Sequence, residues 1–278
     1  MKVFNFLEEN FSQSFTQWVD TFAVETTHNN FRLLPELGTG NFKIFNIEPG
    51  LQVRLWECNL LETVTLHRLT QEIKRNRSFA IIFYLNPEAI LQKKCGDNHQ
   101  SINKIWNTVF LSSDAALDID ILPGKEVKIC CINLSMEWLT TTLLKNNFEA
   151  VYKILIDGIN PVCIFESAGN REIKKIAELY DEYSQKLLGE FFIHSWALYI
   201  LNDFFTKLNS RDVKTILNQN FDPVMAELEK RIISPPGKKL HSLKKLSEEF
   251  SMSPSTIKRN FKKMFGKNIT EYLREKKL

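Results

Sequence analysis

The chain has 278 residues, of which 44% are hydrophobic and 25% are charged. This composition is typical of a globular protein and excludes a wholly disordered one, and the length is sufficient for two domains. The longest apolar stretch, FFIHSWALYILNDFF at 191–205, is interrupted by polar side chains and is shorter than the ~20 residues that a membrane-spanning helix needs. We therefore expect no membrane span, and the mixed opening MKVFNFLEENFSQSF predicts no secretory signal.

The net charge of +3 is unevenly distributed along the chain. Residues 234–278 carry 12 Lys and Arg against 4 Asp and Glu, a net charge of +8, while the rest of the chain carries −5. A basic module beside a mildly acidic one is the electrostatic footprint of a nucleic-acid-binding domain. A solvated basic tail is the alternative.

The cysteines and histidines predict neither a metal site nor a cofactor. The five cysteines are odd in number and lack CxxC spacing, so they suggest no disulfide framework and no zinc site, and they favour a reducing cytoplasm. The five histidines are scattered and form no His-x-His pair: His28, His67, His99, His194 and His241. No Gly-rich phosphate loop or nucleophile elbow is present either, so we expect no catalytic residues.

After an N-terminal helical segment, residues 40–132 are predicted as strands. Apolar and polar residues alternate over 51–55 after the Pro49-Gly50 turn pair, and FAIIFYL at 79–85 is apolar enough for a strand buried on both faces. The segments IEPGLQVRL from Ile47 and ILPGKEVKI from Ile121 share a frame that suggests two similar hairpins. Many short strands with such turns favour a β-sandwich or barrel.

Helical spacing becomes dominant further along the chain. Ser135 is placed to cap a helix over 136–146, and 161–167 could return one more strand. Residues 171–208 have helical spacing throughout, and Gly189 is expected to divide them into two antiparallel helices. The second of these is apolar on more than one side, which fits either core packing within one subunit or an oligomer interface.

Residues 243–266 have the pattern of a helix-turn-helix. Leu243, Leu246 and Phe250 are spaced i, i+3 and i+7 on a short helix, and Ser251 with Met252 forms a tight turn. The next helix is predicted to begin with Ser253 as its cap and Pro254 at its first position. Its inward side chains would be Ile257, Phe261 and Met264, and Gly266 would end it.

The opposite side of this second helix is polar and basic, which suits the major groove of DNA. Ser255, Lys258 and Arg259 are the candidates for contact with base edges, since Arg259 is suited to a bidentate contact with guanine. A second set of side chains is better suited to phosphates, which position a protein without reading sequence: Lys244, Ser253, Thr256, Lys262 and Lys263.

The run SLKKLSEEFSMSPSTIKRNFKKMFGKNITEYLREKKL resembles the first helix-turn-helix of the AraC/XylS family of bacterial transcription regulators. The matching residues are Leu246, Ser247, Ser253, Pro254, Ile257, Arg259, Phe261, Lys262, Gly266, Tyr272 and Leu273. Ser251 stands where the family often has Gly, and a left-handed conformation there would cost ~1 kcal/mol. Asn268 and Glu271 look like a capping box that opens the family's linker helix. The chain ends within that helix, so we expect the second helix-turn-helix of the family to be absent from it.

The resemblance implies an α+β protein with a cupin-like sensor barrel at 1–168, a helical dimerisation hairpin at 169–212 and a partial DNA-binding domain at 213–278. It implies a cytoplasmic regulator, an activator rather than a repressor, that binds double-stranded DNA and an unknown small-molecule effector. It further implies a homodimer through helices 171–208 and allows RNA polymerase as a partner. Arg54, Trp56 and Tyr84 are the effector candidates on predicted strands. The alternative is a cupin-type barrel enzyme or carbohydrate-binding protein with a basic helical appendage.

Overall fold

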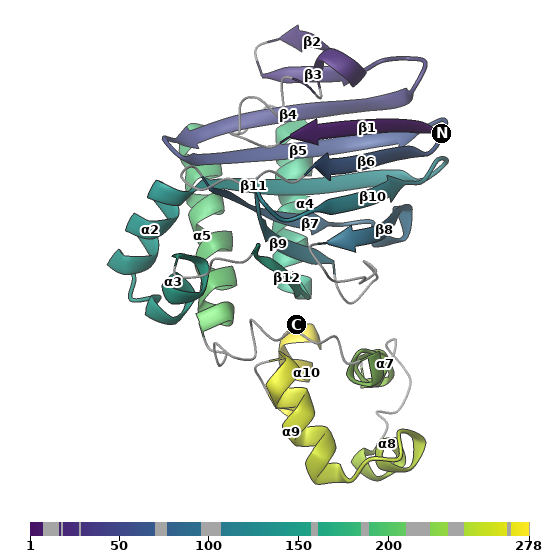
Figure 1. The fold of residues 1–278 in the computed structure, drawn as a ribbon, viewed down its shortest axis with the longest axis vertical. Helices are drawn as coiled ribbons and strands as arrows, with labels where there is room; N and C mark the ends of the chain where they lie inside the picture. The colour runs from purple at the N-terminus through teal and green to yellow at the C-terminus, as the bar shows by residue number, and fades with distance from the viewer. Residues whose placement is uncertain are drawn as a thin grey trace.

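The computed structural model describes residues 1–7, 17, 19–27, 29–69, 77–95, 107–156, 161–184, 189–209, 223–232, 242–265 and 268–277. These residues form an α+β structure, with a large β-sheet region in the N-terminal half and helices toward the C-terminus (Figure 1). The strands are β1 (Lys2–Leu7), β2 (Ala23–Thr27), β3 (Asn30–Leu33), β4 (Gly38–Glu48), β5 (Leu51–Leu60), β6 (Val64–Leu69), β7 (Ser78–Tyr84), β8 (Ile90–Cys95), β9 (Thr108–Ser112), β10 (Leu117–Ile121), β11 (Glu126–Ser135) and β12 (Cys163–Glu166). The helices are α2 (Met136–Lys145), α3 (Glu149–Ile156), α4 (Asn170–Ser184), α5 (Glu190–Asn209), α7 (Pro223–Ile232), α8 (Leu243–Glu249), α9 (Pro254–Phe265) and α10 (Ile269–Lys277), with a short 3-10 turn at Pro87–Ala89.

The described strands form two sheets that pack face to face. One has the order β1-β6-β10-β8, and the other has the order β12-β9-β7-β11-β5-β4-β3-β2. The described strands do not close into one barrel, so the expected cupin-like barrel is corrected to a two-sheet sandwich. A closed barrel would need the two sheets to share hydrogen-bonded edges, whereas here each sheet keeps its own edge strands.

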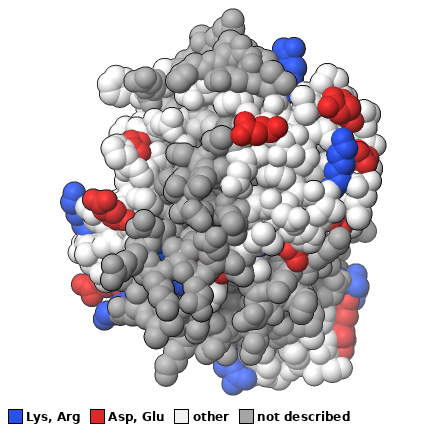
Figure 2. All heavy atoms as spheres, turned by 45° about the horizontal axis from the view of Figure 1, so that its top comes forward, with Lys and Arg blue, Asp and Glu red and all other residues white. Residues whose placement is uncertain are grey.

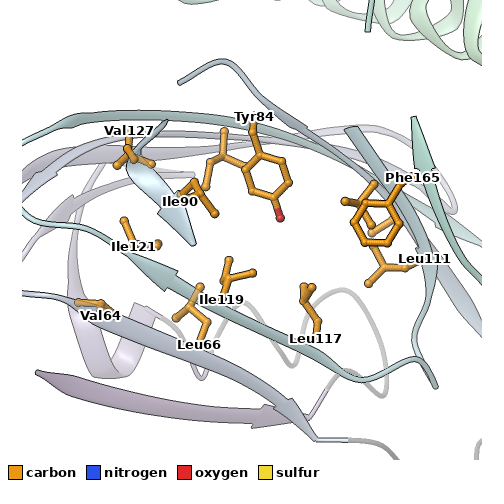
Figure 3. Packing of buried hydrophobic residues seen from close by; sticks show 14 of the residues in the cluster. Val64, Leu66, Tyr84, Ile90, Leu111, Leu117, Ile119, Ile121, Val127 and Phe165 are labelled. Atoms are coloured by element: carbon orange, nitrogen blue, oxygen red, sulfur yellow. The ribbon is translucent and has the colours of Figure 1, made fainter. Parts of the chain in front are cut away.

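A hydrophobic core fills the space between the two sheets (Figure 3). Leu66 and Ile119 from the small sheet face Tyr84 from the large one. Because side chains alternate along a strand, the neighbours of Tyr84 on β7 point the other way, and Phe83 joins a second core beneath the helices. The apolar run 79–85 is therefore buried on both faces, as its composition predicted.

The two Pro-Gly turns lead to different pairings. Gly50 has a φ of +86° between β4 and β5, which pair antiparallel as the predicted hairpin. Gly124 has a φ of +69°, yet β10 before it pairs with β6 and β8, while β11 after it pairs with β5 and β7. The second predicted hairpin is therefore wrong. A turn fixes only the reversal of the chain, and here the next strand crosses to the other sheet.

The chain begins with a strand, β1, where a helical segment was predicted, and among the described residues before β2 helical conformation is found at 17 and 19–22. In β1, Phe4 is buried whereas Val3 and Asn5 on either side are exposed, which is the alternation of a strand with one buried face. Residues 2–7 pair in parallel with β6, and the Phe4 ring packs edge-on against Phe22. Two further strands, β2 and β3, precede residue 40.

The helices α2, α3, α4 and α5 cover the outer face of the large sheet (Figure 1). Ser135 caps α2 by accepting a hydrogen bond from the backbone N–H of Trp138 at 3.1 Å, as predicted. In the helical pair, the Trp196 indole donates to the Lys175 carbonyl, and Arg171 lies over the Tyr199 ring. These contacts run in opposite order along α4 and α5, so the helices are antiparallel. No helix in the described ranges is long and apolar enough to cross a membrane.

Most of the apolar side chains of α5, the second helix of the pair, are buried within one chain. Its buried side chains join the core beneath the large sheet: Ile193, Trp196, Ala197, Ile200, Leu201, Phe204, Phe205 and Leu208. Of the two alternatives for this apolar helix, core packing within one chain therefore accounts for most of its apolar surface. Phe191 and Leu198 remain exposed on the same helix.

One cysteine differs from the expectation of free thiols. Cys163 in β12 is disulfide-bonded, so the expectation of no disulfide is wrong there. Cys58, Cys130 and Cys131 are free thiols, and Cys95 has its side chain outside the described residues. Sequence spacing failed here because disulfide formation depends on how strands meet in space.

Candidate nucleic-acid interface

The helices α8 and α9 form the predicted helix-turn-helix. Ser242 caps α8 by accepting a hydrogen bond from the backbone N–H of Lys245 at 3.2 Å. Ser253 caps α9 by accepting one from the backbone N–H of Thr256 at 3.1 Å, and Pro254 is the first helical residue. Each cap satisfies a backbone donor that the first turn of a helix leaves without a partner. Both helices therefore begin where local sequence predicts.

The turn between the helices is held in a left-handed conformation. Ser251 has a φ of +51°, which is the conformation anticipated for the position where Gly is often found. The backbone N–H of Met252 donates to the Ser247 carbonyl at 3.1 Å, and the Ser247 hydroxyl donates back to the Met252 carbonyl. This reciprocal pair closes the turn and fixes the angle between α8 and α9.

One side of α9 is anchored in a hydrophobic core. Ile257, Phe261 and Phe265 are buried, and the Phe261 and Phe265 ring centroids lie 4.3 Å apart. Leu246 of α8 belongs to the same core, as do apolar side chains of α7. Met264 and Gly266 of the predicted pattern lie outside the described side chains and residues. The prediction that Ile257 and Phe261 face inward is confirmed.

The opposite side of α9 is exposed and basic. Ser255, Lys258, Arg259 and Lys262 are all exposed, and their spacing of i, i+3, i+4 and i+7 places them on one face of the helix. The structure thus brings the three base-contact candidates together with one phosphate candidate.

The other phosphate candidates surround this face. Lys244 is exposed on α8, and Thr256 is half-buried in the first turn of α9. The Ser253 hydroxyl lies 2.8 Å from that of Ser255 and 2.9 Å from that of Thr256, so the three form one hydroxyl cluster at the helix start. Lys263 lies on α9 with its side chain outside the described set.

The effector candidates lie on the inner face of the large sheet. Arg54 and Trp56 come from β5 and Tyr84 from β7, and Trp56 and Tyr84 share a row of the sheet because both are paired with Ile129. Arg54 is 6% exposed and donates a hydrogen bond through Nε to the Gln52 side chain at 2.6 Å, so it is not a solvated surface residue. Burial raises the pKa of Tyr84 well above its usual range. The hydroxyl therefore stays protonated.

Comparisons with known families and curated proteins find no match. Among solved structures, the chain is similar to ToxT from Vibrio cholerae, with 10% identity, a TM-score of 0.29, and coverage of 81% of this chain and 98% of ToxT. A ligand-bound form of ToxT from strain O395 gives 12% identity, a TM-score of 0.30, and coverage of 81% and 99%. At such low identity and TM-score, this similarity supports no conclusion about fold or function.

Charged side chains of both signs are spread over one face of the described surface (Figure 2). On the face in Figure 2, Lys and Arg side chains are interspersed with Asp and Glu. A mixed surface of this kind does not favour a polyanion. Among the described residues, no three His, Cys, Asp or Glu side chains gather as metal ligands.

A buried polar cluster that the sequence did not predict lies where the helix-turn-helix meets the sandwich. Glu229 of α7, Ser167 after β12 and Tyr272 of α10 are all buried there. Tyr272 is one of the residues that match the AraC/XylS pattern, but the sequence predicted no function for it. A signal for Glu229 did exist, because it is spaced i+4 from Met225 and i−3 from Ile232 on the apolar stripe of α7.

Proposed function

We propose that the chain is a sequence-specific DNA-binding transcription regulator. The observation that carries the proposal is the exposed face of α9, where Ser255, Lys258 and Arg259 stand over the buried side chains of Ile257 and Phe261. A short helix held this way by a capped turn can enter the major groove with its polar side toward the bases. The resemblance of this segment to AraC/XylS regulators supports the same function.

The contacts divide into two kinds. Arg259 would read guanine through its fork of N–H groups, with Ser255 and Lys258 beside it. Lys244, Lys262, Lys263 and the hydroxyl cluster of Ser253 and Thr256 would hold phosphates. The N-terminus of α9 supports this division, because its first amides carry partial positive charge.

The remaining parts of the proposal concern regulation. We assign residues 1–168 to a sensor, 169–212 to a dimerisation hairpin and 213–278 to the DNA-binding domain. A small-molecule effector would bind near Arg54, Trp56 and Tyr84 on the inner face of the large sheet. The carbonyl of Trp56 accepts a hydrogen bond from the Tyr180 hydroxyl of α4 at 3.2 Å, which gives that strand a direct contact with the helical pair. The proposal also includes a homodimer, contact with RNA polymerase, activation of transcription and a cytoplasmic location.

The experiment is selection of duplexes from a random DNA pool, followed by fluorescence anisotropy with the selected sequence. Arg259→Ala should weaken binding by ~1–3 kcal/mol and relax the preference at one base pair. Arg32→Ala is the matched control, because Arg32 is an exposed arginine on β3, remote from α9 in the sequence and on another element. Selection of no sequence by the wild type, or equal effects of the two substitutions, would reject the proposal.

A further inference from the structure

The disulfide bond of Cys163 has one possible partner within the chain. Cys163 is disulfide-bonded, and the sequence contains four other cysteines. Three of these are free thiols: Cys58, Cys130 and Cys131. The partner is therefore Cys95. The two cysteines are about seventy residues apart in the sequence, a separation at which a cross-link strongly restricts the unfolded chain.

The two cysteines lie on edge strands of different sheets. The small sheet has β8 at one edge, which ends at Cys95, and the large sheet has β12 at one edge, which begins at Cys163. Both strands lie along the lower side of the sandwich in Figure 1. An edge strand has one side without a hydrogen-bonded neighbour, so no backbone ladder joins β8 to β12.

Apolar side chains from both sheets meet beside this disulfide. Cys95 is paired with Leu117 of β10, and Cys163 is paired with Leu111 of β9. Leu117, Leu111 and Phe165 are buried in the core between the sheets, and Figure 3 shows them at one end of that core. The cross-link therefore spans the two sheets next to these three side chains.

The disulfide lies where external thiols can reach it. Cys163 is half-buried, whereas Leu111 and Phe165 beside it are 0% and 1% exposed. Thiol–disulfide exchange requires access to a sulfur atom, so an accessible disulfide is reduced more readily than a buried one. Cys131 is also half-buried and remains a free thiol, as expected of a cysteine in a reducing compartment. Disulfides that form in such a compartment are usually transient, catalytic or redox-sensing.

The core between the sheets contains a polar atom that favours opening. The Tyr84 hydroxyl is fully buried, and none of the described residues forms a hydrogen bond with it. Figure 3 shows this hydroxyl pointing into the middle of the core. A buried hydroxyl without a partner destabilises the closed state, because water that enters would satisfy it.

We propose that Cys95 and Cys163 form a redox switch, a reversible disulfide that closes this side of the sandwich when oxidised and lets the two sheets separate there when reduced. In closure, the thiolate of one cysteine attacks a low-molecular-weight disulfide and releases one thiol. The second cysteine then attacks the mixed disulfide and releases the other thiol. Two protein thiols thus lose two electrons and two protons, and the external disulfide becomes two thiols.

Opening is the reverse reaction with two external thiols. It would also admit small molecules to the inner face of the large sheet, where Arg54, Trp56 and Tyr84 lie. This last consequence alone rests on the proposed effector site. The switch itself depends on neither DNA nor an effector.

Disulfide mapping by mass spectrometry tests the bond and its reversibility. The full chain is equilibrated in glutathione buffers from oxidised to reduced, alkylated, and digested without further reduction. We expect a peptide pair linked through Cys95 and Cys163 that decreases as reduced glutathione increases. Cys131→Ala removes a half-buried free thiol and, as the control, should keep the linked pair. Absence of the pair in every buffer, or its persistence in fully reduced glutathione, would overturn the switch.

Hydrogen–deuterium exchange tests the opening. Reduction of the wild type should raise exchange about fivefold in 108–112 and 163–166, the strands beside the cross-link, and leave β4 unchanged. Cys163→Ala and Cys95→Ala should each exchange at the reduced rate in both oxidising and reducing buffer, and if one variant fails to fold, the other decides. Cys131→Ala should keep the wild-type difference. Equal exchange in the oxidised and reduced wild type, or an equal rise in β4, would overturn the opening. Because neither experiment uses DNA, failure of the proposed function leaves both readouts intact.

Discussion

The Ser253 hydroxyl accepts a hydrogen bond from the backbone N–H of Thr256 at 3.1 Å and so caps the helix that presents Arg259. Ser253→Ala removes this acceptor and should lower the free energy of unfolding by ~1 kcal/mol. Urea unfolding followed by circular dichroism measures the change. Ser195→Ala, in the second turn of α5, replaces an exposed helical serine whose hydroxyl donates to the Phe192 carbonyl of the same helix and caps nothing, so it should not destabilise. An equal loss in both variants would contradict the cap.

The left-handed conformation of Ser251 predicts a stabilising substitution. Because the φ of +51° is unfavourable for a residue with a Cβ, Ser251→Gly should raise the free energy of unfolding by up to ~1 kcal/mol. Ser255→Gly is the opposite control, since glycine inside a helix costs ~0.5–1 kcal/mol relative to alanine. Urea midpoints that move in the same direction for both variants would show that the turn is not strained.

Local signals predicted the helices well and the sheets poorly. The caps at Ser135 and Ser253 and the start of α7 at Pro223 depend on residues within one turn, and the structure confirms each. The Asn268 and Glu271 capping box is confirmed as well, with reciprocal hydrogen bonds of 2.9 and 3.2 Å. Asp222, expected as the cap before Pro223, lies outside the described residues.

The predictions of strand pairing failed where the pairing depends on segments that are distant in the sequence. The Ile-x-Pro-Gly frame is the same at Gly50 and Gly124, but only the first turn connects strands that pair with each other. The parallel pairing of β1 with β6 joins segments about sixty residues apart, which no local period reveals. For the same reason the face of α9 could be predicted, whereas the cluster of Ser167, Glu229 and Tyr272 required the assembled fold.

Cys58 predicts a loss of stability at alkaline pH. Burial and the nearby charge of Glu57 raise the pKa of this thiol from 9.0 to about 12. Below pH 9 the thiol is protonated in both states, so its contribution is fully present. As the pH rises from 9 toward 12, only the unfolded state releases the proton, and stability falls.

Cys58→Val removes this titrating group while keeping an apolar side chain. Its urea midpoint should therefore fall less than that of wild type between pH 8.5 and pH 10.5, the interval over which a thiol of ordinary pKa releases its proton. Parallel pH profiles for the two proteins would contradict the shifted pKa. As an independent check, iodoacetamide should modify the half-buried Cys131 of the native protein before Cys58.

Lys262 distinguishes phosphate contact from base reading. It is exposed on the same face of α9 as Arg259, one helical turn further along. If it holds a phosphate, Lys262→Ala should lower the slope of log affinity against log salt by ~0.9 and weaken all duplexes alike. Anisotropy over a salt series with selected and scrambled duplexes measures both quantities. Lys145→Ala, at the exposed end of α2, is the control and should leave the slope unchanged. A change of base preference in Lys262→Ala with no change of slope would instead assign Lys262 to the bases.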